Sequence, residues 1–195
     1  MQSDKVLRKF DPLIDAASTD GADPICRKIC EDLKFKRDLI ERISDYKRYF
    51  DGITYTPSHG DYTACQFICD EDKIKAVIDF SAAACLPACW EIMRSYVQSS
   101  GACMNSEPFD IDDFALYVSE YAKHAPLTKK DIEAIPYVYL FQLAGSSYGY
   151  KEYLIKKTEN RDALIKFAFW RTDVCREVER LAGEISQRLL KSVKI

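Results

Sequence analysis

The sequence predicts a mainly α-helical fold with a small β-hairpin, a combination that belongs to the α+β class. The helical part rests on apolar residues that recur every three or four positions in long segments such as 111–123 and 162–191. The hairpin rests on two short runs that are typical of strands, Gln66–Cys69 and Ile74–Ile78. The segment between them, Asp70–Lys73, is wholly charged, as suits an exposed turn.

The N-terminal quarter is expected to hold a weakly structured segment and then a long helix. Residues 1–21 are mixed in character and are expected to be flexible or hinge-like, with a short helix or strand over Lys5–Ile14. Asp23 is a favoured N-cap residue, and Pro24 suits the first turn of a helix. The helical spacing of the apolar residues that follow predicts a helix that runs to about Tyr49.

The remaining elements follow from turn and cap residues. Ile53–Thr56 is β-branched and aromatic and therefore extended, and a helix is expected over Trp90–Ser99. Asp110 is expected to cap the helix 111–123. Thr128 and Asp131 resemble a capping box, which opens a helix that ends near residue 145. The length fits one domain over 1–195.

Composition and charge exclude several classes of function. The net charge of −3 argues against a nucleic-acid binder that relies on bulk electrostatics. The first residues are polar and lack the apolar core of a secretory signal. The most apolar stretch, Ala82–Trp90, is far too short to span a bilayer. We therefore expect a cytoplasmic protein with no nucleic-acid and no membrane partner.

Eight cysteines include three pairs spaced by four, namely 26/30, 65/69 and 85/89. Thiolate zinc sites usually carry closer pairs whose sulfurs converge on one ion. Cys65 and Cys69 fall partly on a predicted strand, where a spacing of four does not bring two sulfurs to one point. The pattern favours reduced thiols in a cytosolic protein over a metal-thiolate site.

The residues that carry chemistry surround the predicted hairpin. Asp61 and Asp79 stand eighteen positions apart, each beside an apolar run, and Gln66 lies five positions after the first acid. Phosphoryl transfer needs a carboxylate beside the acceptor hydroxyl and hard oxygen ligands for a divalent metal. Two acids and an amide supply these groups. His59 and Gly60 precede the first acid, where glycine permits close backbone approach and histidine can hold a loop.

The segments His59-Gly60-Asp61 and Ile78-Asp79-Phe80 resemble the signature motifs of the aminoglycoside phosphotransferase/choline kinase family, distant relatives of protein kinases. The segment Pro87–Arg94, a proline followed by an acid at the start of a helix, is also similar, and the resemblance covers about 23–190. It implies the C-terminal lobe of the protein-kinase-like fold. It also implies ATP and Mg²⁺ as cofactors, and a small hydroxyl-bearing substrate whose contact residues cannot be assigned. Asp61 would be the catalytic base, Asp79 and Gln66 the Mg²⁺ ligands, and His59 and Gly60 the residues that shape the loop.

Two departures from the family pattern change what is expected. Gln66 stands where the family usually has asparagine, so its amide oxygen sits on a longer stem. The family's N-terminal lobe, with its glycine-containing phosphate loop and strand lysine, has no counterpart before the first predicted helix. We therefore expect weak ATP binding and little or no turnover from this chain alone. The lobe face is expected to be apolar, and either a homodimer or an N-terminal lobe would cover it.

Two alternatives stay open beside the kinase reading. The first is a catalytically silent binding module that keeps the fold. The second is a helical scaffold whose motifs match by accident, with Asp61 and Asp79 acting only as turn or cap residues and Gln66 as an ordinary strand residue. A pocket that contains both acids would argue against the scaffold.

Overall fold

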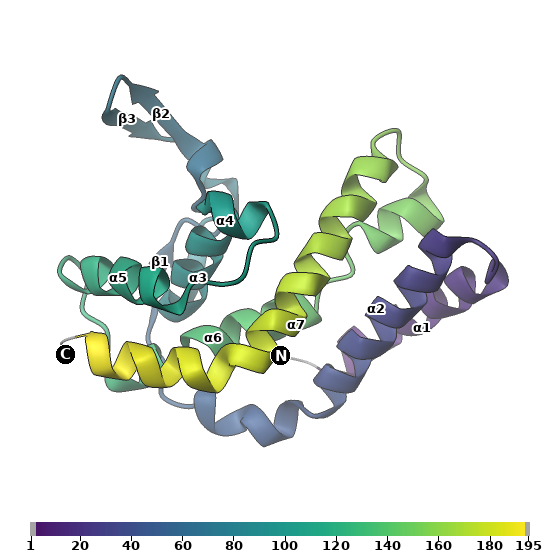
Figure 1. Ribbon diagram of the computed structural model, residues 1–195, viewed down its shortest axis with the longest axis horizontal. Coiled ribbons are helices and arrows are strands. Elements are labelled where there is room, and N and C mark those ends of the chain that lie inside the picture. Colours follow the sequence, from purple (N-terminus) through teal and green to yellow (C-terminus); the bar gives the residue numbers. More distant parts are fainter. Residues whose placement is uncertain (1–2, 194–195) are drawn as a thin grey trace. The chain divides into compact units, whose positions relative to one another are not determined.

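The computed structural model describes residues 3–193 and is mainly helical, with two antiparallel sheets of two strands each (Figure 1). The helix-rich fold with a hairpin that the sequence predicts is therefore confirmed. Within the described residues, no helix combines the length and apolar composition that a bilayer span requires. The elements are α1 (Ser3–Thr19), α2 (Pro24–Glu41), η1 (Ile43–Tyr49), β1 (Tyr55–Ser58), η2 (Ala64–Gln66), β2 (Phe67–Asp70), β3 (Lys73–Val77), η3 (Phe80–Ala82), β4 (Ala84–Pro87), α3 (Ala88–Ser99), α4 (Gly101–Met104), α5 (Ile111–Ala122), α6 (Lys129–Ala144), η4 (Glu152–Lys156) and α7 (Arg161–Ser192).

The described chain forms two compact units. Unit 1 contains the residues up to Lys47 together with Leu140–Glu177. Unit 2 contains Arg48–Tyr139 and the residues from Val178 onward. The sequence reasoning placed all of these residues in one domain, and that expectation stays a prediction.

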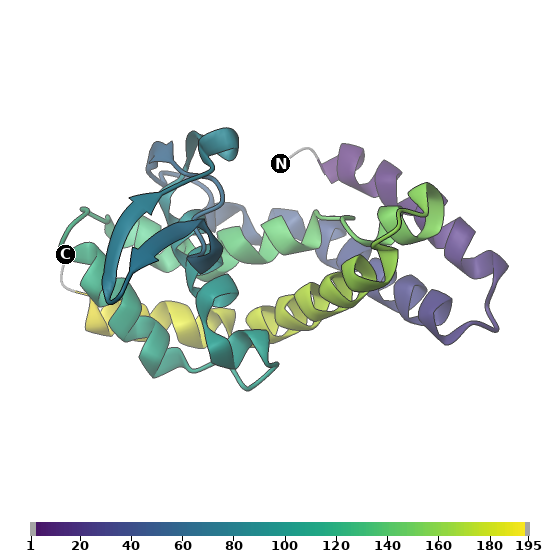
Figure 2. The same cartoon turned by 90° about the horizontal axis from the view of Figure 1, so that it is seen from above.

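In unit 1, helices α1 and α2 pack side by side as a helical hairpin (Figures 1 and 2). The apolar face of α1 is buried through Val6, Phe10, Leu13 and Ala17, which recur at helical spacing. The segment 5–14, expected to be a short helix or strand, is thus part of a longer helix. Its interior Pro12 is exposed and does not end it.

Helix α2 begins as expected and ends earlier than expected. The Asp23 carboxylate accepts the Ile25 N–H at 3.0 Å, and Pro24 occupies the first turn. The helix ends at Glu41, however, and a 3-10 helix, η1, continues to Tyr49. The expectation of one helix to Tyr49 was therefore wrong.

Aromatic packing accounts for the tighter winding of η1. Residues three apart lie nearly in line along a 3-10 helix. In unit 1, Tyr46 meets the edge of Phe141 at 5.1 Å between ring centroids. In unit 2, Tyr49 stacks on Tyr137 at 3.6 Å. These contacts involve residues almost a hundred positions away, so local periodicity carried no sign of them.

A buried polar network joins α2 to the C-terminal part of unit 1. Asp32 is fully buried and accepts bonds from the Tyr150 hydroxyl at 2.9 Å and from Arg176 at 2.8 Å. Lys36, one turn further, is also buried and donates to the Ser146 carbonyl at 3.0 Å. Buried charges are costly unless they are paired, so these contacts fix how the two segments meet.

In unit 2, a short sheet of β1 and β4 leads into helix α3, and Asp131 ties this region to the start of α6. Thr56 pairs with Leu86 in the antiparallel β1–β4 register. Asp131 is fully buried and accepts bonds from the backbone N–H and hydroxyl of Thr54, at 2.6 and 2.8 Å. It also accepts the Thr128 N–H at 2.9 Å, which confirms the expected capping pair. Strand β4 was not expected from the sequence.

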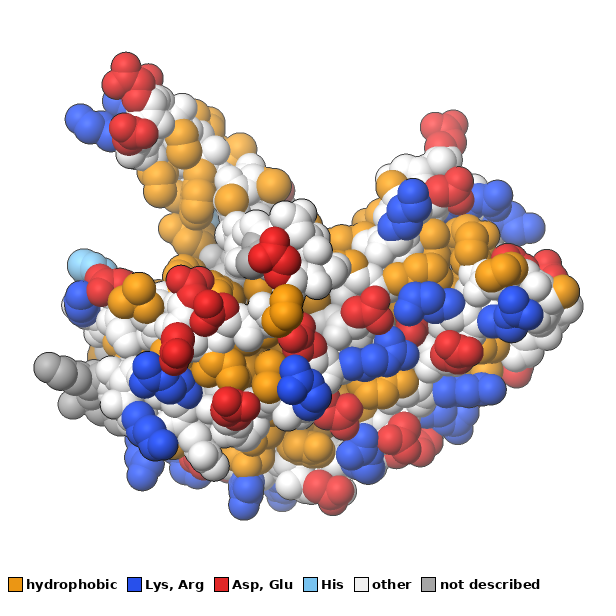
Figure 3. Space-filling view, viewed as in Figure 1, with side chains coloured by type: hydrophobic (Ala, Val, Ile, Leu, Met, Phe, Trp, Pro, Cys, Tyr) orange, Lys and Arg blue, Asp and Glu red, His pale blue; other side chains and the backbone are white. Residues whose placement is uncertain are grey.

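The β2–β3 hairpin stands away from the helices of unit 2 (Figure 1). Figure 3 shows apolar side chains along its stem and charged ones at its tip. Ile68 on β2 is 50% exposed and Ile74 on β3 is 58% exposed. The strands fall within one residue of their expected positions, but Gln66 ends the 3-10 turn η2 instead of lying in β2.

The network of unit 1 predicts a pH-dependent stability that depends on Lys36. Burial lowers the pKa of Lys36 from 10.5 to about 8. Between these values the unfolded chain holds a proton that the folded chain has released, so the free energy of unfolding should rise with pH. Across the whole window the rise should be on the order of 3 kcal/mol.

Lys36→Met should lack this rise, whereas Lys34→Met, at an exposed position of the same helix, should keep it. Urea unfolding at a series of pH values measures the effect. Parallel pH profiles of the parent and Lys36→Met would contradict the role of Lys36.

Asp131 should be a main support of unit 2 at neutral pH. Burial raises its pKa, but the hydrogen bonds from Thr54 and Thr128 outweigh burial and leave the pKa below its ordinary value of 3.8. Asp131→Ala leaves buried donors without partners and should cost about 2–4 kcal/mol. The stabilisation exists above the ordinary pKa and should disappear as the pH falls through the lowered one.

Denaturant unfolding of the parent and the variant at neutral and acid pH checks this prediction. Asp162→Ala, in the first turn of α7 with its side chain 80% exposed, is the control and should cost less than about 1 kcal/mol. A deficit for Asp131→Ala that persists unchanged in acid would show that its charge is not the cause.

Candidate functional site

The loop that follows β1 carries the first motif, His59-Gly60-Asp61, and turns sharply at Gly60. The second motif is Ile78-Asp79-Phe80. Gly60 has a φ of +82°, a backbone conformation that L side chains rarely adopt. A Cβ at this position would overlap the backbone carbonyl of Ala82, just after the second motif. The two motifs are therefore in direct backbone contact, and only glycine fits between them.

Glu91, in the first turn of α3, holds this loop in place. Its Oε1 accepts the Gly60 N–H at 2.5 Å and its Oε2 accepts the His59 N–H at 3.1 Å. A carboxylate that accepts two backbone N–H groups makes strong, charge-assisted bonds. The sequence reasoning noted an acid at this place after Pro87 but gave it no role, because the loop it contacts lies about thirty positions earlier.

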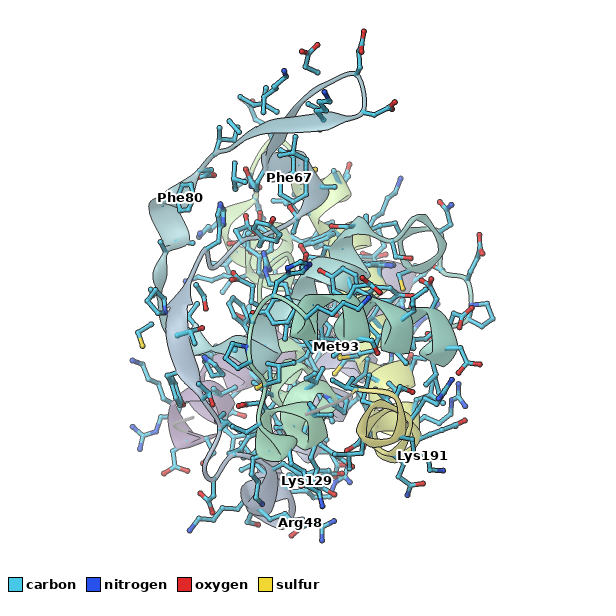
Figure 4. The ribbon with its side chains drawn as sticks, turned by 90° about the vertical axis from the view of Figure 1, so that its left-hand side faces the viewer. Arg48, Phe67, Phe80, Met93, Lys129 and Lys191 are labelled. Carbon is cyan, nitrogen blue, oxygen red and sulfur yellow. The ribbon has the colours of Figure 1, made fainter. Side chains whose placement is uncertain are left out.

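The His59 ring links the first motif to the residue before Asp79. Its Nε2 lies 2.8 Å from the Ile78 carbonyl, and its Nδ1 accepts the Asp61 N–H at 3.2 Å. The Nδ1 atom must accept, so Nε2 carries the proton and the ring is neutral. The ring also packs against Phe80, 4.6 Å away between centroids. Figure 4 shows Phe67 and Phe80 where the hairpin joins the body of unit 2.

Asp61 is bound on both carboxylate oxygens. Oδ1 is paired with the Arg94 guanidinium, and Oδ2 accepts the Gln66 amide N–H at 3.3 Å. Arg94 was not identified from the sequence. The only available signal was its position three residues after Glu91, which places both side chains on the same face of a helix.

Gln66 and Asp79 lie at the two sides of the hairpin base. The backbone carbonyl of Gln66 accepts the N–H of Ile78, the residue before Asp79, at 2.9 Å. The Asp79 carboxylate is exposed and accepts bonds from the Ser81 hydroxyl at 2.6 Å and the Ser81 N–H at 3.3 Å. These bonds lower the pKa of Asp79, so the group is anionic at neutral pH. Asp79 has a φ of 59°, in the left-handed region that Asp tolerates better than most residues.

The available oxygens suit a hard divalent cation. Asp79 offers an exposed anionic carboxylate. A carboxylate can only accept, so the Gln66 atom that faces Asp61 must be nitrogen, and this leaves the amide oxygen for another partner. Mg²⁺ binds through oxygen and usually keeps waters and substrate phosphates beside one or two protein groups. Asp79 and Gln66 match this small number of protein ligands.

The contact at Gly60 predicts an unusually large cost for one added methyl group. Gly60→Ala would be strained by the positive φ, and its added methyl group would also overlap the Ala82 backbone. That backbone cannot move aside without displacing the second motif. Gly52→Ala is a matched control, because Gly52 has a φ of +79° and open space around it.

Gly60→Ala should lower the free energy of unfolding by about 2 kcal/mol or more beyond the loss from Gly52→Ala. Chemical denaturation of the two variants measures the difference. Equal losses would mean that the two motifs do not press on each other at Gly60.

Comparison of the chain with protein-family models, with curated proteins and with solved structures finds no match. The likeness to the aminoglycoside phosphotransferase/choline kinase family therefore rests on the sequence motifs alone and stays a prediction.

Proposed function

We propose that unit 2 carries the phosphoryl-transfer site of a small-molecule kinase that resembles the aminoglycoside phosphotransferase/choline kinase family. ATP would be the phosphoryl donor, with Mg²⁺, and a small molecule with a hydroxyl group would be the acceptor. The observation that carries this proposal is the way Ile78 is held. Its N–H donates to the backbone carbonyl of Gln66, and its own carbonyl is bonded to the His59 ring. The loop of the first motif therefore contacts the residue before Asp79 directly.

Convergence of this kind is what a phosphoryl-transfer site requires. A loop acid and a metal-binding acid must be held at a fixed separation while a phosphate lies between them. Here the first acid follows His59 and Gly60, both of which Glu91 anchors. The second acid follows Ile78, which the same histidine binds. Accidental matches of two short motifs would not be expected to share these bonds, which weighs against the helical scaffold.

Each residue has a definite task in the proposed reaction. Asp61 orients the acceptor hydroxyl and receives its proton, while Gln66 and Arg94 keep the carboxylate in one orientation. Asp79 and the Gln66 amide oxygen would hold Mg²⁺. When bound, the metal neutralises phosphate oxygens as charge develops on them. Gly60 lets the loop lie against the second motif.

A catalytically silent binding module remains the second candidate, and one contact favours it. The Arg94 guanidinium already neutralises Asp61, and a base engaged in an ion pair is less free to take a proton from a hydroxyl. A silent module would still bind the nucleotide and metal through Asp79. Nucleotide binding therefore tests what both candidates share and what the scaffold lacks.

The test measures how tightly the protein binds ATP with Mn²⁺. The paramagnetic relaxation of water protons serves as the readout. The parent should bind in the millimolar range. Asp79→Asn should weaken binding about tenfold or more, because a neutral amide replaces the anionic ligand but still caps η3. Asp61→Asn should leave the affinity within about twofold, because Asp61 acts on the acceptor and not on the metal.

Asp72→Asn is the matched control, since Asp72 is an exposed acid in the turn of the same hairpin. It should bind Mn²⁺ and ATP as the parent does. Equal affinities for the parent and Asp79→Asn would remove Asp79 from the metal site and with it the proposed function.

A further inference from the structure

The short helical turn η4 and the residues beside it form an exposed surface of unit 1, which the proposed phosphoryl-transfer site does not use. Two large side chains of this surface, Tyr148 and Ile155, are 48% and 52% exposed. The Tyr148 ring meets the edge of Phe167 at 6.5 Å between centroids, so it lies beside the first turns of α7. Lys151 stands four positions before Ile155, which places the two side chains on the same side of the turn. The surface therefore combines apolar side chains with a neighbouring cation.

Buried contacts hold this turn in a fixed position. Gly149 has a φ of +91°, and a Cβ there would overlap the backbone carbonyl of Leu164. Tyr150 is fully buried, and its hydroxyl donates to Asp32 at 2.9 Å. Glu152 is also buried and accepts the Gly149 N–H at 2.8 Å. The inward side chains thus fix a π-helical turn, a rare conformation that is frequent at functional sites, and the outward side chains are presented on a rigid support.

The charge of this segment is opposite in sign to that of the whole chain. Residues 148–166 contain five Lys or Arg and three Asp or Glu, whereas the chain has a net charge of −3. Within the described part of the chain, Lys151, Lys157 and Lys166 are exposed and form no ion pair. One of the three acids, Glu152, is buried and paired with a lysine of the same turn. Figure 3 shows Lys and Arg side chains beside apolar ones where α7 begins.

We propose that this surface binds a bilayer that contains anionic lipids. The lysines would lie at the headgroups, with Tyr148 and Ile155 between the headgroups and the acyl chains. The negative potential of such a membrane attracts each nearby lysine strongly enough to raise the binding constant about fivefold. Apolar side chains surrounded by cations are what peripheral membrane binding requires. The proposal concerns unit 1 and does not depend on phosphoryl transfer.

The types of the exposed side chains favour a lipid surface over a nucleic acid. Single-stranded nucleic acids stack their bases on exposed aromatic rings, and the aliphatic Ile155 offers no such face. Tyrosine, with an apolar ring and a polar hydroxyl, suits the boundary between lipid and water. The long stem of Lys151 lets its ammonium group reach the headgroups while Ile155 enters more deeply. The expectation of no membrane partner rested on the lack of a spanning segment, which a protein bound at the bilayer surface does not need.

The experiment measures co-sedimentation of the full chain with lipid vesicles. Phosphatidylcholine vesicles that contain phosphatidylserine should bind the protein. Vesicles of phosphatidylcholine alone should bind it at least about tenfold more weakly, because they carry no net surface charge. Molar salt should abolish the difference between the two kinds of vesicle, since it screens the attraction.

Variants assign the binding to this surface. Lys151→Gln combined with Lys157→Gln should weaken binding about tenfold or more. Ile155→Ser should weaken it about threefold or more, because it removes apolar surface and leaves the charge unchanged. The matched control is Lys129→Gln combined with Lys130→Gln, two exposed lysines at the start of α6 in unit 2. It changes the net charge equally and should stay within about twofold of the parent.

A fluorescent side chain shows which part of the chain meets the lipid. The emission of Tyr148→Trp should move to shorter wavelength when the anionic vesicles are added, because the indole enters a less polar medium. Tyr55→Trp should show no such change, since Tyr55 is 60% exposed on β1 in unit 2. Leu116→Ser, at a position of α5 that is 61% exposed, is the control for Ile155→Ser and should bind as the parent does.

Three results would overturn the proposal. The first is equal binding to vesicles with and without phosphatidylserine. The second is an equal loss for the two pairs of lysine substitutions, which would mean that overall charge and not this surface governs binding. The third is a single-stranded RNA homopolymer that displaces the protein from vesicles while Ile155→Ser binds as the parent does, which would assign the lysines to a nucleic acid. All the substituted side chains are at least partly exposed, so the variants are expected to fold.

Discussion

The geometry of the candidate site depends on one carboxylate and the two backbone N–H groups it accepts. Glu91 fixes the loop at His59 and Gly60, and no regular secondary structure does so in its place. Hydrogen bonds to a charged group contribute about 1.5–3 kcal/mol each, more than ordinary backbone bonds. Because Glu91 lies in the first turn of α3, the position of the loop follows from the position of that helix.

Close contacts between this loop and the second motif hold the second motif in place as well. Gly60 lies so near Ala82 that no side chain fits, and His59 bonds to Ile78 across the same space. Backbone and ring contacts of this kind leave little freedom for relative movement, since packed groups cannot be compressed. Asp61 and Asp79 are thus attached to a common rigid base, although each is also exposed enough to meet a ligand.

Sequence reasoning succeeded where the determining interaction is local. Asp23 and Asp110 cap their helices as expected, because a cap bonds to N–H groups two or three residues away. The hairpin was found from residues within a dozen positions of one another. Reasoning failed where distant residues decide the outcome. The aromatic partners of η1 and the pairing of strand β4 both depend on such contacts.

The residues of the candidate site likewise include some that the sequence could predict and some that it could not. The types and spacing of Asp61, Gln66 and Asp79 suffice to suggest the chemistry, because those residues must be present for it. The residues that orient them, Glu91 and Arg94, belong to a helix about thirty positions further on, and their pairing follows from packing. Acids and arginines on an amphipathic helix are ordinarily surface residues, so their positions alone did not mark them.

The exposed stem of the hairpin bears on how such a site could work. Ile78 and Phe80, on either side of Asp79, are 42% and 60% exposed, and Ile68 and Ile74 are exposed on the strands above. A sheet of two strands is marginally stable by itself, and apolar residues this exposed gain free energy when another surface covers them. Covering the stem would also remove water from around Asp79, and attraction between opposite charges strengthens as water is removed. In the proposed function, the same contact that stabilises the hairpin would therefore also strengthen the attraction between Asp79 and a bound Mg²⁺ ion.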